Sequence, residues 1–137
     1  MLYAEALNEV SPSNPDILKY VNLVRERAGL AKLEVLNPAI TGNQTLQREA
    51  IRRESRIELA TEGQRYFDVR RWMIAEGTPG KGKQGGDFYG MNMDGNVSTF
   101  NQRVIVQRRI FETKQYLQPI PFNEIEKSTN LVQNPGW

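Results

Sequence analysis

Charged and apolar residues are interleaved with helical spacing between residues 43 and 74, and this stretch constrains the fold more than any other part of the chain. Its aliphatic residues fall at positions that gather along one side of an α-helix; they are Leu46, Ala50, Ile51, Ile57 and Leu59. The pattern predicts a long helix from Asn43 to Glu62. Gly63 interrupts it, and a shorter helix from Arg65 to Ile74 is expected to follow.

A helical hairpin is predicted at the start of the chain. Residues 1–8 show helical spacing of apolar side chains, and a Ser/Pro/Asn-rich turn follows. Asn14 is a suitable N-cap for a second helix, Pro15 suits its first position, and Gly29 suits its end. The apolar stripe expected on that helix is Ile17, Tyr20, Val21, Val24 and Ala28. Such hairpins occur in tetratricopeptide-like stacks, although this chain shows no second copy.

The second half of the chain is predicted to be irregular. Seven of the eleven glycines lie in the segment Gly77–Gly95, which predicts a long surface loop. Residues 104–111 fit either an extended segment or a short helix. Pro119 and Pro121 favour an extended tail over residues 117–137, whose apolar side chains predict that it packs back on the helices. The expected fold is mostly α, with long irregular loops and an extended C-terminal tail.

The composition excludes several classes of function. The 137 residues suit one domain with a substantial core. The absence of Cys and His excludes thiolate chemistry, His-ligated zinc and Ser-His-Asp triads. A formal net charge of +2 is too small to produce the strongly positive electrostatic potential of a dedicated nucleic-acid-binding protein. No apolar run reaches the roughly 18 residues that a membrane-spanning helix needs.

Glu54, Glu58 and Glu62 recur every four residues, so their carboxylates would share one face of the predicted long helix. Paired carboxylates can catalyse glycoside hydrolysis, which requires a general acid with a raised pKa. Arginines crowd this stretch, and nearby cations lower the pKa of a carboxyl group. We therefore expect structural ion pairs, no catalytic residue and no enzyme. Removal of Glu58 or Arg65 is expected to destabilise the fold.

The candidate binding residues are Phe88 and Tyr89, the two aromatic residues of the glycine-rich segment. An exposed aromatic ring can stack on the apolar face of a sugar, and the tyrosine hydroxyl can also hydrogen-bond to it, which favours Tyr89. The alternative is that Phe88 anchors the loop to the core. Asp94 and Asn96 resemble part of a calcium loop but lack the EF-hand spacing and its terminal glutamate. We therefore expect no metal site and no cofactor.

A series of motifs resembles the C-terminal region of the SusD/RagB family, in the same order along the chain. The motifs are Tyr3-Ala-Glu-Ala6, Val24-Arg-Glu-Arg-Ala-Gly-Leu30, Arg48-Glu-Ala-Ile51, Glu54-Ser-Arg56, Glu58-Leu59, Glu62-Gly63, Arg65, Asp68-Val-Arg-Arg-Trp72, Tyr116-Leu-Gln-Pro-Ile-Pro121, Glu124-Ile125 and Gln133-Asn-Pro-Gly-Trp137. The resemblance covers nearly the whole chain apart from residues 77–104. The departures are small: Val69 stands where the family has Leu, and Trp137 where it has Tyr.

The resemblance implies a SusD-like, mostly helical fold in which residues 1–137 form the C-terminal part of a larger domain. It implies a non-enzymatic subunit that binds glycans or other nutrients at the surface of the bacterial outer membrane. Its partner would be a SusC-like TonB-dependent transporter, and its membrane anchor a lipidated Cys that this chain lacks, so we expect a fragment of a longer protein. The alternative is a helical protein–protein interaction module without ligand binding.

Overall fold

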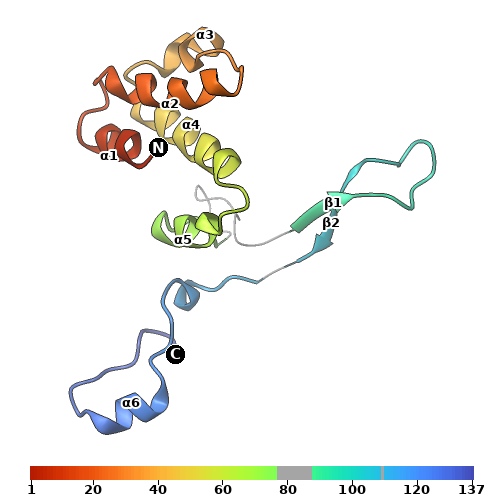
Figure 1. Cartoon of the computed structure of the whole chain (residues 1–137). Helices are drawn as coiled ribbons and strands as arrows, with labels where there is room; N and C mark the ends of the chain where they lie inside the picture. Colours follow the sequence, from red (N-terminus) through yellow and green to blue (C-terminus); the bar gives the residue numbers. More distant parts are fainter. Residues whose placement is uncertain (77–87, 109) are drawn as a thin grey trace. The chain divides into compact units, whose positions relative to one another are not determined.

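The computed structural model describes residues 1–76, 88–108 and 110–137. They fall into two compact units, Met1–Arg65 and Tyr66–Trp137, and each is described here by itself. Figure 1 shows the helices and strands in chain order, coloured from red at the N-terminus to blue at the C-terminus. Helices predominate among the described elements, and the two strands form one small sheet, so the expected mostly α fold is confirmed.

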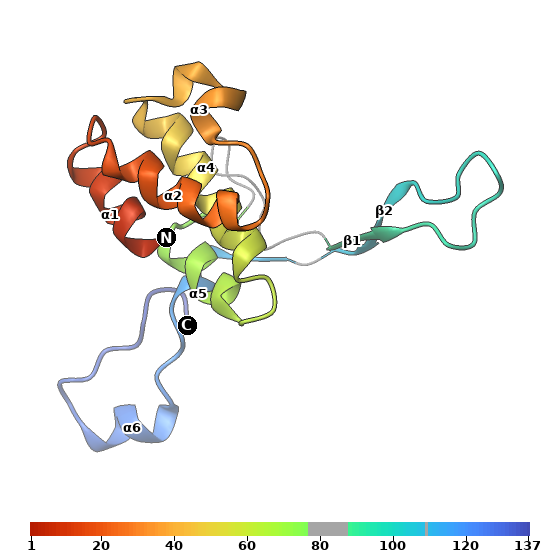
Figure 2. The same ribbon diagram turned by 45° about the horizontal axis from the view of Figure 1, so that its top comes forward.

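The first unit is built on three packed helices, α1 (Leu2–Val10), α2 (Asp16–Arg27) and α4 (Gln44–Glu58), which lie beside one another in Figures 1 and 2. The short helix α3 (Leu33–Leu36) and the 3-10 helix η1 (Pro38–Ile40) connect α2 to α4. Side chains from all five elements form one core; its buried members are Ala4, Ile17, Leu18, Val21, Leu33, Ile40, Ala50 and Ile51.

Both ends of α2 follow the signals in the sequence. The side-chain oxygen of Asn14 accepts a hydrogen bond from the backbone N–H of Asp16 at 2.9 Å, which satisfies one donor of the first turn. At the other end Gly29 has a φ of +72°, and the N–H of Leu30 donates to the carbonyl of Arg25 at 2.9 Å. This is a Schellman motif. The predicted α1–α2 hairpin is therefore confirmed.

The buried face of α2 differs from the predicted stripe. Tyr20 and Ala28 are exposed, whereas the polar residue Asn22 is buried. The Oδ1 atom of Asn22 accepts from the N–H of Leu33 at 3.0 Å, and its Nδ2 donates to Oε2 of Glu34 at 2.8 Å. A buried amide with both of its polar atoms bonded is tolerated in a core. Ile17 and Val21 of the predicted stripe are buried, so apolar periodicity alone locates only part of the buried face.

Helix α4 begins where predicted and ends earlier. The Oδ1 atom of Asn43 accepts from the N–H of Leu46 at 3.1 Å and caps the first turn. The helix stops at Glu58 and does not continue to Glu62, because the following residues form a turn that leads into Gly63. Gly63 has a φ of +73°, a conformation that residues with a β-carbon rarely adopt.

A buried ion pair joins α2 to α4. Nη1 of Arg25 lies 2.5 Å from Oε1 of Glu54, and the two side chains are only 7% and 6% exposed. Nε of Arg25 also donates to the carbonyl oxygen of Ala31 at 2.8 Å. The guanidinium group therefore has fixed partners on both sides and sets the geometry between the two helices.

The neighbouring ion pair between Glu58 and Arg27 is a surface feature, since the Arg27 side chain is 69% exposed. Exposed pairs of this kind contribute about 0–1 kcal/mol to stability. The expectation for Glu58 rested on a buried partner, and that premise is wrong because Arg27 is exposed. The structural role expected of Glu58 belongs to Glu54, and for Arg65 the expectation stays a prediction.

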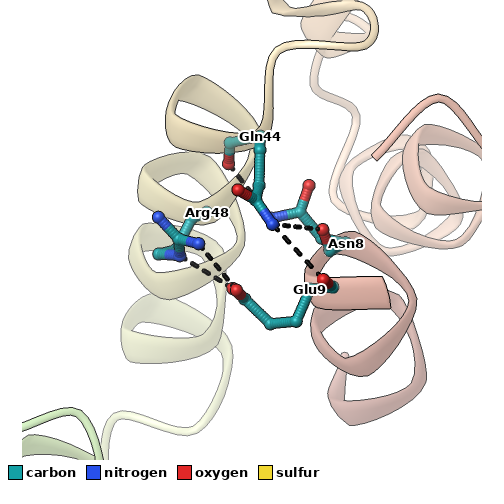
Figure 3. A network of polar contacts seen from close by, with 4 residues as sticks. All are labelled: Asn8, Glu9, Gln44 and Arg48. Carbon is teal, nitrogen blue, oxygen red and sulfur yellow. Dashed lines mark hydrogen bonds and ion pairs between the residues drawn. The ribbon is translucent and has the colours of Figure 1, made fainter. Parts of the chain in front are cut away.

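Hydrogen bonds and an ion pair connect the end of α1 to the start of α4 (Figure 3). Arg48 donates from Nε and Nη2 to the two carboxylate oxygens of Glu9, at 2.7 and 2.6 Å. The side chain of Gln44 donates to the carbonyl oxygens of Asn8 and Glu9, which belong to the last turn of α1. These contacts satisfy carbonyls that have no partner within the helix. The bidentate geometry fixes the pairing of the two helices.

We expect the contribution of Glu9 to stability to depend on pH. The hydrogen bond from Arg48 lowers the pKa of Glu9 below its ordinary value of 4.5. A carboxyl group with a lowered folded-state pKa stabilises the fold above its unfolded value and loses that contribution as the pH falls through the folded value. Glu9→Gln should therefore be slightly less stable than the parent at pH 7. The difference should shrink as the pH falls through the acidic range and Glu9 becomes protonated, and a difference that stays constant in urea titrations at each pH would contradict this account.

The second unit has a small core around the end of α5 (Gln64–Arg71). Its buried residues are Val69, Ile74 and Ala75, with Trp72, Phe111 and Tyr116 packed against them. The hydroxyl oxygen of Tyr116, in the 3-10 helix η2 (Thr113–Tyr116), accepts from the backbone N–H groups of Ala75 and Glu76 at 3.1 and 3.2 Å. The predicted short helix is present and ends three residues before Ile74.

The C-terminal tail, which contains α6 (Phe122–Lys127), folds back on its own backbone. The side chain of Gln133 makes two hydrogen bonds to the backbone of Ile120, at 2.8 and 2.9 Å. Nε1 of Trp137 donates to the carbonyl oxygen of Lys114 at 3.0 Å. The prediction that the apolar side chains of the tail are buried on helices is wrong for the exposed Leu117, Phe122, Leu131 and Trp137. Polar side chains bonded to the backbone hold the tail instead.

Candidate functional site

The two candidate residues lie on a β-hairpin (Figure 1). Strand β1 (Phe88–Met91) pairs antiparallel with β2 (Arg103–Gln107). The predicted irregular loop is therefore wrong for residues 88–91 and correct for residues 92–95, whereas residues 77–87 lie outside the described residues. Of the two alternatives for residues 104–111, the extended segment is correct as far as Gln107.

Gly90 allows the two strands to approach closely. The register shifts between Phe88 and Tyr89, which leaves Val106 as an extra residue on β2. A β-carbon at position 90 would lie only 2.6 Å from Cγ2 of Val106. Glycine in a strand often marks such a close approach of two backbones. In the sequence, the high glycine content around position 90 predicted a loop instead.

We expect Gly90→Ala to open the hairpin locally. The new methyl group would collide with the stiff, β-branched side chain of Val106, and overpacking of this kind costs about 1–3 kcal/mol. Hydrogen exchange should become faster at the amides of β1 and β2 and stay unchanged in α4. The double variant Gly90→Ala/Val106→Ala should restore slow exchange. Identical exchange in Gly90→Ala and the parent would rule out the proposed collision.

Tyr89 is paired with a cation across the hairpin. The guanidinium carbon of Arg103 lies 3.8 Å from the centroid of the Tyr89 ring, within the range of a cation–π interaction. Tyr89 is 50% exposed and Phe88 is 48% exposed, so neither is a buried core residue. An exposed ring beside a group with five N–H donors offers both apolar and hydrogen-bonding surface to a hydroxyl-rich ligand. Sequence reasoning missed Arg103, because only strand pairing places it beside Tyr89.

The turn between the two strands is held by its own hydrogen bonds. Oδ1 of Asn96 accepts from the backbone N–H and the hydroxyl group of both Ser98 and Thr99, at 2.6 to 3.1 Å. The N–H of Asn92 donates to the carbonyl oxygen of Gln102 at 2.9 Å. The side-chain oxygen of Asn96 is therefore used to build the turn.

The three glutamates of the charged stretch do not share one environment. Glu54 is buried against Arg25, Glu58 lies at the surface against Arg27, and Glu62 follows the end of α4. In the part of the chain that the structure describes, no group of three or more His, Cys, Asp or Glu side chains could hold a metal ion. None of the described helices is both long enough and apolar enough to cross a membrane.

Comparisons with known proteins place these features in a family. The family model described as the SusD family matches residues 1–137. SusD-like protein P2 of Formosa agariphila is 31% identical in an alignment 140 residues long, which covers 100% of this chain and 24% of that protein. The crystal structure of a SusD-like protein from Bacteroides fragilis matches with a TM-score of 0.76 at 34% identity, over 98% of this chain and 23% of that one.

The chain thus spans about a quarter of the length of the proteins that it matches. The match includes the helices, the hairpin and the tail, because it runs through all the described elements. The resemblance drawn from the motifs and the SusD-like fold are both confirmed. The chain belongs to the SusD family.

Proposed function

We propose that this chain is part of a protein that binds glycans or other nutrients at the surface of the bacterial outer membrane. The observation that carries the proposal is the family match, which extends over residues 1–137. In this proposal the whole protein delivers its ligand to a SusC-like TonB-dependent transporter. In the same proposal, the whole protein is attached to the outer membrane through a lipid anchor.

The proposed role is binding without catalysis. A glycosidase needs two carboxyl groups that face the scissile bond from opposite sides. Glu54 is instead enclosed with Arg25 in the first unit, where it fixes two helices. The geometry of this carboxylate supports a structural role.

The proposed ligand contact of this region is Tyr89, with Phe88 as a second candidate. Arg103 lies over the Tyr89 ring, so a sugar that reaches this ring would also meet guanidinium N–H groups. Aromatic contact combined with hydrogen bonding suits the mixed polarity of a sugar. The hairpin positions Tyr89 through strand pairing, and Tyr89 lies opposite Ile105.

The test uses a full-length hybrid, in which this chain replaces the matched 140 residues of SusD-like protein P2. We expect Tyr89→Ala in the hybrid to weaken binding of oligosaccharides about three- to tenfold in calorimetric titrations, because one ring supplies only part of the affinity. The melting temperature should change little, since an exposed cation–π pair contributes about 0.5–1 kcal/mol.

Phe122→Ala is the matched control, because Phe122 is an exposed aromatic residue on α6 and not on the hairpin. It should leave the affinity for oligosaccharides unchanged. Parent affinity in Tyr89→Ala would remove Tyr89 from the site. A large fall in its melting temperature would show that Tyr89 has a structural role instead.

A further inference from the structure

Arg103 differs from three arginines of the first unit in what its guanidinium group contacts. Arg25, Arg27 and Arg48 each pair with a carboxylate. Arg103 is exposed and lies over the ring of Tyr89. Among the residues that the structure describes, no oxygen atom accepts a hydrogen bond from its guanidinium group. An arginine side chain has five N–H donors, so those of Arg103 are available to a ligand.

The strand register places Arg103 on an exposed face of the hairpin. Met91 pairs with Arg103. Tyr89 pairs with Ile105, two residues further along β2. Because side chains alternate between the two faces of a strand, these four side chains share one face. Tyr89, Met91 and Ile105 are 50%, 56% and 42% exposed. Arg103 reaches the Tyr89 ring as its diagonal neighbour across the strands. The face therefore holds an aromatic ring, apolar surface and a cation next to one another.

The charge of Arg103 is not balanced within the hairpin. Residues 88–108 contain three charged residues, Asp94, Arg103 and Arg108. Asp94 lies in the turn that follows β1, and within the described part of the chain no ion pair links it to Arg103. Arg108 follows the end of β2 and adds a second positive charge. The hairpin thus carries more positive than negative charge, which favours a ligand with a negative charge.

A cation beside an exposed ring suits a sugar that carries an acidic group. The ring offers a surface to the apolar face of the sugar. The planar guanidinium group can donate two parallel hydrogen bonds to an acidic group, and such charge-assisted bonds are stronger than those to a neutral hydroxyl. We propose that Tyr89 and Arg103 select acidic sugars, whose carboxylate or sulfate ester binds to Arg103. This inference rests on the proposed function and narrows its ligands to one chemical class.

The test measures binding of the full-length hybrid to pairs of oligosaccharides that differ only in charge. Oligosaccharides of uronic acids are paired with their methyl esters, and sulfated oligosaccharides with their desulfated forms. The pairs are screened on an array, and affinities are then measured by calorimetry. The acidic member of at least one pair should bind about tenfold more tightly than the neutral member, as expected for a charge-assisted hydrogen bond. Added salt should reduce this preference, because salt screens exposed charges.

Variants show whether the preference comes from this chain or from the rest of the hybrid. Arg103→Gln, and Arg103→Met as a second neutral variant, should each bring the two members of the pair to within about threefold of each other. Arg103→Lys should keep only part of the preference, because an ammonium group retains the charge but lacks the planar fork. Arg108→Gln is the matched control, since it removes a positive charge beyond the end of β2. It should keep the preference of the parent.

The outcomes separate this inference from the proposed function. Equal binding of both members of every pair would overturn the selection of acidic sugars and leave glycan binding intact. A preference that persists in the neutral variants of Arg103 would also overturn it, because the preference would then come from another part of the hybrid. A hybrid that binds no oligosaccharide would overturn the proposed function and this inference with it. The kind of pair that shows the preference identifies the acidic group as a carboxylate or a sulfate ester.

Discussion

Glu54→Ala is expected to destabilise the first unit by about 3–5 kcal/mol, because it leaves the guanidinium group of Arg25 buried without its counter-charge. The two side chains are 6% and 7% exposed, so water cannot replace the lost carboxylate without opening the helix packing. Urea unfolding followed by far-ultraviolet circular dichroism measures the change, since α2 and α4 both contribute to the helical signal.

Glu58→Ala provides the matched control. Glu58 lies one turn further along α4, and its partner Arg27 is exposed, so the loss should stay within about 1 kcal/mol. Removing both charges together, as in Arg25→Met/Glu54→Leu, should recover much of the loss, because apolar residues of similar size can replace a buried pair. Equal stabilities for Glu54→Ala and Glu58→Ala would refute a special role for the buried pair.

Ile51→Ala is expected to lower stability by about 2–5 kcal/mol, because it leaves a cavity in the core of the first unit. Ile51 is 1% exposed and packs among residues of α1, α2 and α4. Ile57→Ala is the control in the same helix, since Ile57 is 64% exposed. Its effect should stay within about 0.5 kcal/mol.

The same urea titrations distinguish the two isoleucines. If Ile57→Ala were as destabilising as Ile51→Ala, position 57 would be buried in solution and the assignment of the core would be wrong. The sequence pattern predicted both residues for the apolar side of the helix. The structure separates them, because Ile51 belongs to the buried core of the first unit whereas Ile57 is exposed.

Local signals in the sequence predicted the helices well. Asn14, Gly29 and Asn43 act on backbone groups within a few residues of themselves, so their effects can be read without knowledge of the fold. The burial of Asn22 and Arg25 could not be found in this way. Each depends on a partner that is distant along the chain, Leu33 in one case and Glu54 in the other.

The amino-acid composition of the β-hairpin did not predict its strands. The glycine content around Gly90 is typical of a loop. The strand nevertheless requires glycine at position 90, because Val106 lies so close. Tyr89 was identified from the sequence as a candidate, but its cation partner Arg103 emerged only with the strand register. The tail was misjudged for a related reason: Gln133 and Trp137 hold it through hydrogen bonds to the backbone, which apolar patterns do not reveal.

Two charged motifs of the family supply the buried ion pair of this chain. Arg25 belongs to the motif Val24–Leu30 and Glu54 to the motif Glu54–Arg56, and the two meet between α2 and α4. These motifs therefore maintain the helical framework. In the proposed function, ligand contact belongs instead to Tyr89 on the hairpin.

The most direct test of this division of roles is calorimetric titration of oligosaccharides into the full-length hybrid and its Tyr89→Ala and Glu54→Ala variants, at a temperature where all three are folded. The account predicts measurable binding by the hybrid, weaker binding by Tyr89→Ala with little change in melting temperature, and nearly parent affinity in Glu54→Ala with a lower melting temperature. The opposite pattern, with affinity lost in Glu54→Ala and kept in Tyr89→Ala, would contradict it, as would a hybrid that binds no oligosaccharide.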